Sequence, residues 1–597
     1  MKKCVMQGHI LVMGLGWLLT SQAAEVRFSP VPVPQSPAEK AAITVSPSVT
    51  INGASYPIGY HTILRSGERS GDHVFGQLID ATGQPIVAAD GSPLISNSND
   101  FASLLNLPSG LFMVSHFEDR PGAMYLTELQ QDADGLLTAL RTRPIDFSSV
   151  KGGWVHCAGS VTPWQTHLGS EEYEPDARFM DPATGYIDDY YAPMADYYGG
   201  DLLALNPYDY GWVTEVAVSN FDETSVVKHY AMGRVSVEMA LVMPDQRTVY
   251  ISDDGTNVGL YLFHADKKAD LSAGHLYALR WQQTGSEQGG QALAQWVPLG
   301  HASDSDIQPL LEQRITFGDL FDSADPDDSG QCPAGFVSVN HGHDDGLHEC
   351  LRLRPGMEQA ASRLETRRYA AMQGATTELR KEEGLSHDPT SNRLFIAMSE
   401  VDQGMEDNMR YGQADDRYDS GGPNHIRLPM NRCGAVYGMS LGLGILQGSW
   451  WSRYSGKHIV AVLSGRMTQA LDPTSSIVYD PAGPLAANRC DVEAIANPDN
   501  ISFIPAANTL LVAEDSDYHE NNMAWAYDLG AGHLTRIQTA PLGAEITSFD
   551  YYPNINGHGY LMSVIQHPFD DYEDAAPDAQ ARHAVTGYIG PFPVMSK

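Results

Sequence analysis

The sequence predicts an all-β fold built from many short strands. The chain of 597 residues contains 56 Gly and 36 Pro, and only 19% of its residues are charged, which is typical of turn-rich β proteins. Short apolar runs recur, each preceded by a turn signal and followed by acidic residues: 248–251 before Asp253 and Asp254, 393–398 before Glu400, and 509–513 before Glu514 and Asp515. A repeated strand–turn–strand unit of this kind is typical of the blades of a β-propeller.

The first residues have the pattern of an export signal. Lys2 and Lys3 form a basic start, residues 10–19 are largely apolar, and residues 21–23 (SQA) form a small-residue cleavage site. Ten largely apolar residues are too few to span a bilayer, and no other uninterrupted apolar run approaches the required length. We therefore expect a cleaved Sec-type signal peptide over residues 1–23, a periplasmic or secreted mature protein, and no membrane anchor.

The mature chain is expected to consist of an arm and one large domain. Residues 24–60 are rich in proline and predict an extended N-terminal arm. The recurring strands assign residues 61–597 to a single propeller domain with long loop insertions and a few short helices. The largest insertion is an excursion near residues 320–380. Within it, residues 356–383 have the Ala, Glu, Arg and Met content of one helix or two short ones.

The charge of the chain restricts its partners. With 37 Lys and Arg against 74 Asp and Glu, the formal net charge is −37. No basic excess exists to neutralise phosphate backbones, which argues against a nucleic-acid or anionic-membrane partner. The acidic excess suits a soluble protein that holds cations. We expect a monomer that binds no nucleic acid.

Export makes the cysteine count informative. Five cysteines remain after the signal peptide: Cys157, Cys332, Cys350, Cys433 and Cys490. Pairing is expected in an oxidising compartment. Cys332 and Cys350 flank a short loop rich in Gly and Asp, and Cys433 and Cys490 can form a second bridge. Cys157 is then left over, and the count alone leaves open whether it is a buried inert thiol or a functional one.

Two further motifs are weaker. Residues 438–442 (GMSLG) match the G-x-S-x-G nucleophile elbow, but that motif needs a following helix, which Gly444 opposes. A serine hydrolase is therefore not favoured. His341, His343 and His348 lie in an acidic stretch that can hold a metal ion. We favour a solvated loop closed by a Cys332–Cys350 bridge.

The strongest local pattern is residues 152–164 (GGWVHCAGSVTPW), followed by Glu171 and Glu172. It sets the Cys157 thiol between small residues, with a carboxylate pair about fourteen positions later. Oxygen ligands suit Ca²⁺ or Fe³⁺, and a thiolate additionally favours a transition metal. If this stretch stood alone, a Gly-rich turn with surface carboxylates would be the better explanation.

Together with other segments, this pattern resembles the PhoX-type alkaline phosphatases, a family of phosphatase-like propellers. The matching segments follow the family order from about residue 60 to 570: residues 157–172, 253–254, 381–384 (KEEG), 431–434 (NRCG), 498–500 (PDN), 543–547 (GAEIT) and 566–568 (QHP).

The resemblance implies a six-bladed propeller whose central channel holds two irons and several calcium ions and hydrolyses phosphomonoesters. It implies Ca²⁺ and Fe³⁺ as cofactors and small phosphorylated molecules as substrates. The implied metal ligands are the Cys157 thiolate, which would bind iron, and the carboxylates of Glu171, Glu172, Glu238, Glu383, Asp499 or Asp515, and Glu545.

The chain departs from the family pattern where phosphate is expected to bind. The family's Arg-Pro-Glu motif is Lys381, Glu382 and Glu383 here, so the catalytic cation would be Lys381 or its neighbour Arg380. The family signature more often has Gly, Trp and Cys where this chain has Gln165, His167 and Ser170. Two alternatives therefore stay open: a calcium-binding propeller with weak or no catalysis, and a lactonase-like, calcium-dependent propeller hydrolase.

Overall fold

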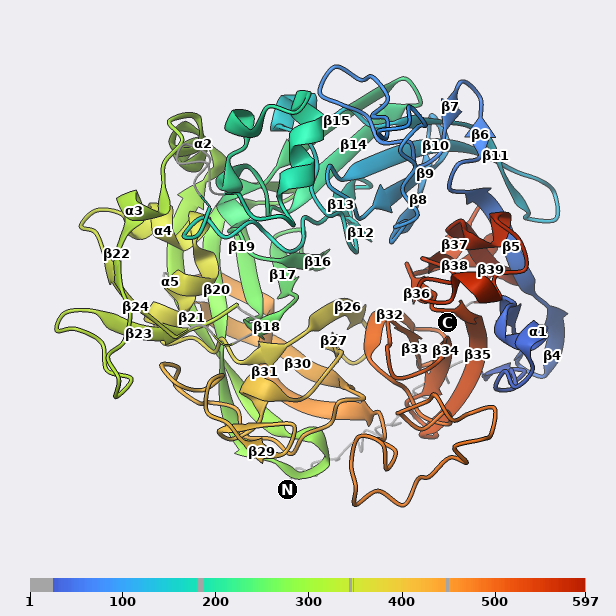
Figure 1. Cartoon of the computed structure of the whole chain (residues 1–597). Helices are drawn as coiled ribbons and strands as arrows, with labels where there is room; N and C mark the ends of the chain where they lie inside the picture. The colour runs from blue at the N-terminus through green and yellow to red at the C-terminus, as the bar shows by residue number, and fades with distance from the viewer. Residues whose placement is uncertain (1–24, 181–186, 343–345, 347, 447–449, 596–597) are drawn as a thin grey trace, which may run out of the picture.

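Antiparallel β-sheets arranged around a common centre form the framework of the molecule (Figure 1). The computed structural model describes residues 25–180, 187–342, 346, 348–446 and 450–595. The prediction of an all-β fold with a few short helices is confirmed. The expected signal peptide, residues 1–23, lies outside the described residues.

The sheets follow one another along the chain as antiparallel units. The first unit contains β8 (Ala102–Leu107), β9 (Gly110–Phe117), β10 (Ala123–Gln131) and β11 (Leu137–Pro144). The second contains β12 (Ser160–Val161), β13 (His167–Gly169), β14 (Thr214–Asn220) and β15 (Glu223–Lys228). The third contains β16 (Val237–Val242), β17 (Thr248–Asp253), β19 (Tyr261–Lys267), β20 (Asp270–Gly285) and β21 (Gln291–Ser303).

The second half of the chain continues this pattern. The fourth unit contains β26 (Glu382–Asp388), β27 (Arg393–Met398), β30 (Ala435–Leu446) and β31 (Trp450–Ser464). The fifth contains β32 (Pro498–Ile504), β33 (Thr509–Glu514), β34 (Asn521–Asp528) and β35 (His533–Leu542). The last contains β36 (Glu545–Thr547), β37 (Tyr551–Ile555), β38 (His558–Gln566) and β39 (Val585–Pro593). Because β21 pairs with β31, the third and fourth units form one nine-stranded sheet, and the six-blade count stays a prediction.

The N-terminal segment closes the ring. Strand β5 (Gly59–Arg65) pairs with β39 near the other end of the chain, so blue and red ribbons lie side by side in Figure 1. Strand β2 (Thr44–Val45) extends the fifth unit by pairing with β35. Strands β1 (Val26–Phe28), β3 (Ser48–Ile51) and β4 (Ala54–Pro57) form a small sheet, and α1 spans Pro37–Lys40. The Pro-rich segment is thus extended and tied to the last two units, while the division into arm and domain stays a prediction.

The excursion near 320–380 combines a small sheet with helices. Strands β22 (Phe321–Ala324), β24 (His348–Leu353) and β23 (Val337–Asn340) form the sheet. Helices α2 (Asp304–Glu312) and α3 (Phe317–Leu320) precede it, and α4 (Glu358–Leu364) and α5 (Thr366–Met372) follow. The helical content expected over 356–383 is therefore two short helices. Strand β25 (Leu379–Arg380) then pairs with β18 (Thr256–Val258), and β28 (Met409–Arg410) pairs with β29 (Gln413–Ala414).

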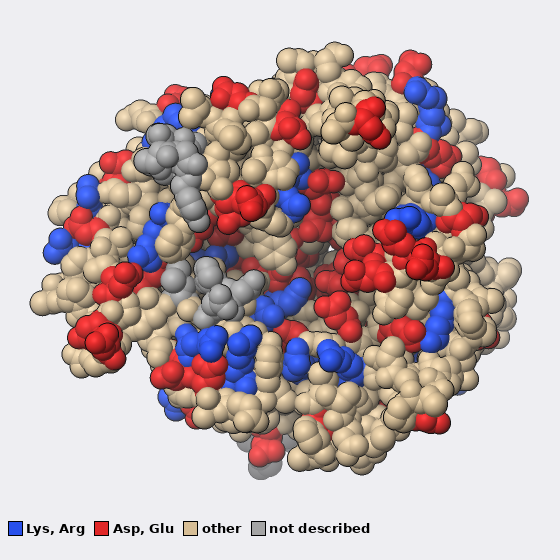
Figure 2. Space-filling model, in the orientation of Figure 1, with Lys and Arg blue, Asp and Glu red and all other residues tan. Residues whose placement is uncertain are grey.

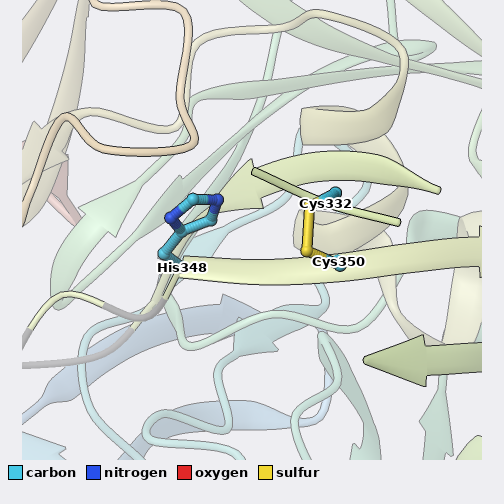
Figure 3. Close-up of side chains that lie close together, drawn as sticks. All are labelled: Cys332, His348 and Cys350. Carbon is cyan, nitrogen blue, oxygen red and sulfur yellow. A yellow bond between two sulfur atoms is a disulfide. The ribbon is translucent and has the colours of Figure 1, made fainter. Parts of the chain in front are cut away.

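Both expected disulfides are present. Cys332 is bonded to Cys350 and Cys433 to Cys490, which leaves Cys157 as a free thiol. Figure 3 shows the first bond with His348 beside it. Because both sulfurs are used in the bond, they offer no ligand to a metal ion. His341 is not solvated as expected: it is buried, and its Nε2 lies 2.7 Å from Glu349 Oε2. His343 lies outside the described residues.

The position of residues 438–442 in the fold also excludes a nucleophile elbow. Residues 438–442 lie inside β30, whereas a nucleophile elbow requires a strand-to-helix turn. Among the described residues, no helix is long and apolar enough to cross a membrane.

The core lies between neighbouring units. Phe395 of β27 and Phe503 of β32 meet there with ring centroids 5.6 Å apart, and Leu510 packs in the same apolar cluster. Burying such a side chain stabilises the fold by about 1.5–3 kcal/mol. Since apolar side chains fill the spaces between units, the innermost strands are held with their ends around the centre.

Candidate metal centre

Acidic side chains recur at one position in successive units. The innermost strand of a unit begins where its antiparallel neighbour ends, so both positions lie at the same edge. We call the residues at this edge the central cluster: Asp100, Cys157, Glu238, Glu383, Asp499 and Glu545 at or just before innermost strands, and Glu118, Glu172, Asp254 and Asp515 after second strands. Figure 2 shows acidic and basic side chains gathered around a hollow near the middle of this face.

Three of these residues owe their direction to β-bulges at matching places. In β16 the register shifts between Val237 and Ala240, in β26 between Glu382 and Leu385, and in β32 between Pro498 and Ile501. A bulge places an extra residue on one strand and re-aims its side chain. The first bulged residues are Glu238, Glu383 and Asp499, and one carboxylate oxygen from each lies within 4.8 Å of the others.

This trio of carboxylates is buried, and among the described residues only Glu383 has an ion-pair partner, Lys381. Both oxygens of Glu238 and Oε1 of Glu383 have no nitrogen or oxygen hydrogen-bond partner among the described residues. Burial, together with the charges of Glu383 and Asp499, raises the pKa of Glu238 well above its usual range. Hard oxygen atoms grouped in this way fit a cation such as Ca²⁺, which would remove their mutual repulsion.

A second group contains the free thiol. Ligand atoms of Glu118, Cys157 and Glu172 lie within 4.8 Å of one another. Burial first, and then the charges of Asp100 and Glu238, raise the pKa of the Cys157 thiol well above its usual range. Since the charge of Glu238 acts on the thiol, the two groups adjoin. One sulfur among oxygens suits a transition metal, which would favour the thiolate.

Three linked hydrogen bonds hold the backbone at Cys157, and the donor of each bond can be assigned. His116 Nδ1 lies 2.5 Å from the carbonyl oxygen of Cys157 and must donate, because a carbonyl only accepts. Burial lowers the pKa of His116 to about 4, so the ring is neutral and its Nε2 accepts from Nε2 of His167, 2.5 Å away. His167 Nδ1 then accepts from the Ser103 hydroxyl at 2.8 Å. His167 stands at a position where the chain departs from the family pattern. Its structural partner is the buried His116.

Of the two expected phosphate-binding cations, one lies in the central cluster. Lys381 Nζ is 3.4 Å from Glu383 Oε1, 3.9 Å from Asp254 Oδ2 and 4.0 Å from Asp515 Oδ2. Arg380 instead pairs with Glu400 at 2.9 Å and donates to Thr256 Oγ1 at 2.7 Å.

The structure does not bring Glu171 to the cluster. Its Oε1 lies 2.7 Å from Lys228 Nζ, both side chains are fully buried, and its other oxygen accepts the N–H groups of Gly211 and Trp212. Adjacent side chains in an extended segment point to opposite sides, so Glu172 faces the cluster and Glu171 faces away. We therefore leave Glu171 out of the ligand set.

The structure distinguishes the remaining expected ligands. Asp499 joins Glu238 and Glu383, whereas Asp515 is partly exposed and faces Lys381. Glu545 belongs to neither close group, but burial and the charges of Asp515 and Glu118 raise its pKa well above its usual range.

Sequence reasoning missed Asp100, Glu118 and Asp254 as site residues. Asp254 lies at a strand end and in one of the segments that resemble the family, but the sequence assigns it no role in the site. For Asp254 the sequence does contain a signal in its spacing. Glu238 and Asp254 are sixteen residues apart, and so are Asp499 and Asp515. The repeat reflects one bulged innermost strand, one turn and one second strand.

A cavity of about 350 Å³ opens beside the cluster. Asp254 belongs to its wall, together with Tyr173, Tyr190 and Trp154. The Tyr173 hydroxyl donates to Asp254, which joins the cavity wall to the cluster.

Comparisons with known proteins agree with this architecture. PhoX of Pseudomonas fluorescens, solved in complex with vanadate, a transition-state analogue, is 16% identical with a TM-score of 0.59 over 94% of this chain and 98% of that one. A family AA12 carbohydrate-active enzyme of Trichoderma reesei is 10% identical over 92% and 99% of the two chains, with a TM-score of 0.32. No curated protein sequence matches. The first likeness confirms the propeller fold.

The family profile described as alkaline phosphatase PhoX matches residues 129–432, about half of the chain. The matched stretch includes Cys157, Glu172, Glu238, Lys381 and Glu383. The chain belongs to the PhoX alkaline phosphatase family.

Proposed function

We propose that this protein is an exported, metal-dependent phosphatase that hydrolyses phosphomonoesters at the central cluster. One observation carries the proposal: three bulged innermost strands bring Glu238, Glu383 and Asp499 together beside the only free thiol of the described chain. Three buried carboxylates with one lysine beside them cost folding energy, and a cation bound there offsets that cost. Family membership supports phosphomonoester hydrolysis as the reaction.

The two groups of donor atoms in the central cluster suit different metal ions. Glu238, Glu383 and Asp499 offer oxygen alone and would hold Ca²⁺. Cys157 adds sulfur to the oxygens of Glu118 and Glu172 and would hold Fe³⁺. When bound, such cations act as Lewis acids that neutralise the charge of phosphate oxygens.

Lys381 would contact the substrate directly. Its ammonium supplies hydrogen-bond donors for a phosphate oxygen. Burial opposes the charge, but Asp254, Glu383 and Asp515 outweigh it and raise the pKa of Lys381 well above its usual range. The side chain therefore stays charged throughout the alkaline range. Arg380, paired with Glu400, is a positioning residue for the same turn.

The cavity beside Asp254 has the size and lining of a leaving-group site. Its accessible aromatic residues Tyr173 and Tyr190 suit an organic alcohol, while its three arginines, Arg234, Arg367 and Arg368, already bind backbone carbonyls or carboxylates. This supports small phosphomonoesters of uncharged alcohols as substrates.

Two disulfides are typical of a protein that folds in an oxidising compartment, which supports the proposed periplasmic or secreted location. Cys157 stays reduced there if a metal ion occupies the sulfur.

Hydrolysis of p-nitrophenyl phosphate by purified protein tests the proposal. We expect activity that is lost with EDTA and restored by Ca²⁺ together with Fe³⁺. Turnover of a lactone but not of the phosphate ester, or phosphate hydrolysis untouched by exhaustive chelation, would count against it. Metal binding without any hydrolysis would point to an inactive calcium-binding propeller.

A further inference from the structure

Two histidines and an aspartate meet on the outer strands of the third unit, away from the central cluster. The strand order is β16-β17-β19-β20-β21, with β16 innermost. His275 on β20 is directly opposite His301 on β21, and on its other side it is opposite His264 on β19. Residues directly opposite each other in a sheet project from the same face. Three imidazoles therefore form one row across three strands.

Asp266 completes the group. It follows His264 by two residues, at a register shift of β19 between Ala265 and Lys267. Its Oδ2 lies 3.0 Å from His301 Nε2. Ligand atoms of Asp266, His275 and His301 all lie within 4.8 Å of one another. Two atoms bound to one tetrahedral zinc at about 2.0–2.1 Å lie about 3.3 Å apart, so the Asp266–His301 pair already has nearly the required spacing.

The side chains of this group are partly exposed, and two of their rings pack against each other. The His301 side chain is 41% exposed and that of Asp266 35%. The His275 ring packs 4.8 Å from the His301 ring.

We propose that Asp266, His275 and His301 form a separate surface site for a divalent transition-metal ion such as Zn²⁺. Two imidazole nitrogens and one carboxylate oxygen are the donors that such ions prefer over Ca²⁺. Three protein ligands on an exposed face leave a coordination position open to water. A metal ion bound here links β19, β20 and β21 at the end of β21 that is remote from its pairing with β31.

The site is independent of phosphate hydrolysis. None of its three residues belongs to the central cluster, and the ligand chemistry differs from the oxygen and sulfur donors found there. Variants at the site are therefore expected to leave phosphatase activity unchanged.

Zinc titration of the purified holoenzyme tests this site. The variants are His275→Ala, His301→Ala and Asp266→Asn, and His533→Ala is the matched control, an exposed histidine of β35 outside every potential metal group of the described residues. We expect the parent protein and the control to bind one more equivalent of Zn²⁺ than the three variants, and zinc to raise the melting temperature of the first two only. Cu²⁺ loaded at this site should show electron paramagnetic resonance splitting from two nitrogens, reduced to one by His275→Ala.

Equal zinc stoichiometry and affinity in the parent and in all three variants would overturn the proposal. If His275→Ala fails to fold, His301→Ala decides, because that side chain is exposed and its loss leaves no cavity. Loss of zinc binding in the His533→Ala control as well would show non-specific binding by surface histidines, and would equally overturn it.

Discussion

The Lys381 ammonium lies 3.4 Å from Glu383 Oε1, two residues further along the chain. Lys381 has a φ of 48°, and its N–H donates to the Gly255 carbonyl at 2.8 Å. This left-handed turn between β25 and β26 directs the ammonium over the bulge that presents Glu383. The two side chains thus form one local unit that places a positive charge inside a group of carboxylates.

Replacing Lys381 by Met should reduce kcat/KM for p-nitrophenyl phosphate by about 10- to 100-fold, since one charge-assisted hydrogen bond contributes about 1.5–3 kcal/mol. Lys381→Arg should retain most of the activity because it keeps a charged donor. Lys457→Met, an exposed site, is the matched control. Parent-like kinetics of Lys381→Met would remove Lys381 from substrate contact.

Asp499 and Asp515 should behave differently although both follow the same strand pattern. Asp499→Asn weakens the oxygen trio with Glu238 and Glu383, so calcium content and activity should fall together. Asp515→Asn, which changes a partner of Lys381, should keep the calcium. Metal analysis of both variants checks this, and calcium loss in Asp515→Asn alone would reverse the assignment.

Glu171→Gln should affect folding rather than metal binding. It leaves Lys228 charged and buried without its carboxylate partner, which costs about 3 kcal/mol of unfolding free energy. Urea denaturation measures the loss, and the Glu171→Gln/Lys228→Met double variant should recover much of it. Lost calcium or iron in a folded Glu171→Gln protein would return this residue to the ligand set.

The free energy of unfolding should include a contribution from protonated His229 that is lost at alkaline pH. Burial opposes protonation of His229, but the carboxylates of Asp304, 3.6 Å away, and Glu215, 2.8 Å away, outweigh it and raise its pKa from 6.5 to about 9. A raised pKa stabilises the fold fully below pH 6.5, and this stabilisation is lost as the pH rises through about 9. His229→Gln should therefore cost about 3 kcal/mol at pH 6 and little above pH 10. An equal cost at both pH values in urea titrations would contradict the ion pair.

The sequence allowed much of the fold to be predicted, because local patterns carry it. Turn signals and apolar runs located β17, β27 and β33, and the odd cysteine count singled out Cys157. Other features depend on contacts between distant segments. The closure of the ring by β5 and β39, and the sheet that joins β21 to β31, leave no local pattern.

The same limit applies to the site. Glu171 and Glu172 are neighbours in the sequence, and only the direction of the backbone decides which of them faces the cluster. Asp100 and Glu118 have no distinctive flanking residues, so nothing but their position at strand ends reveals them. Conversely, the recurring bulges in β16, β26 and β32 explain why acidic residues found as isolated motifs converge on one point.

Metal analysis and p-nitrophenyl phosphate hydrolysis, compared between the parent protein and Cys157→Ser, test the central claim most directly. A thiolate bound to Fe³⁺ gives a charge-transfer band, whereas a serine hydroxyl is rarely deprotonated at neutral pH. We predict a coloured parent protein that contains iron and calcium, and a folded Cys157→Ser variant that keeps much of its calcium and loses colour, iron and activity together. A colourless, iron-free parent protein whose Cys157→Ser variant hydrolyses the substrate equally fast would contradict the account.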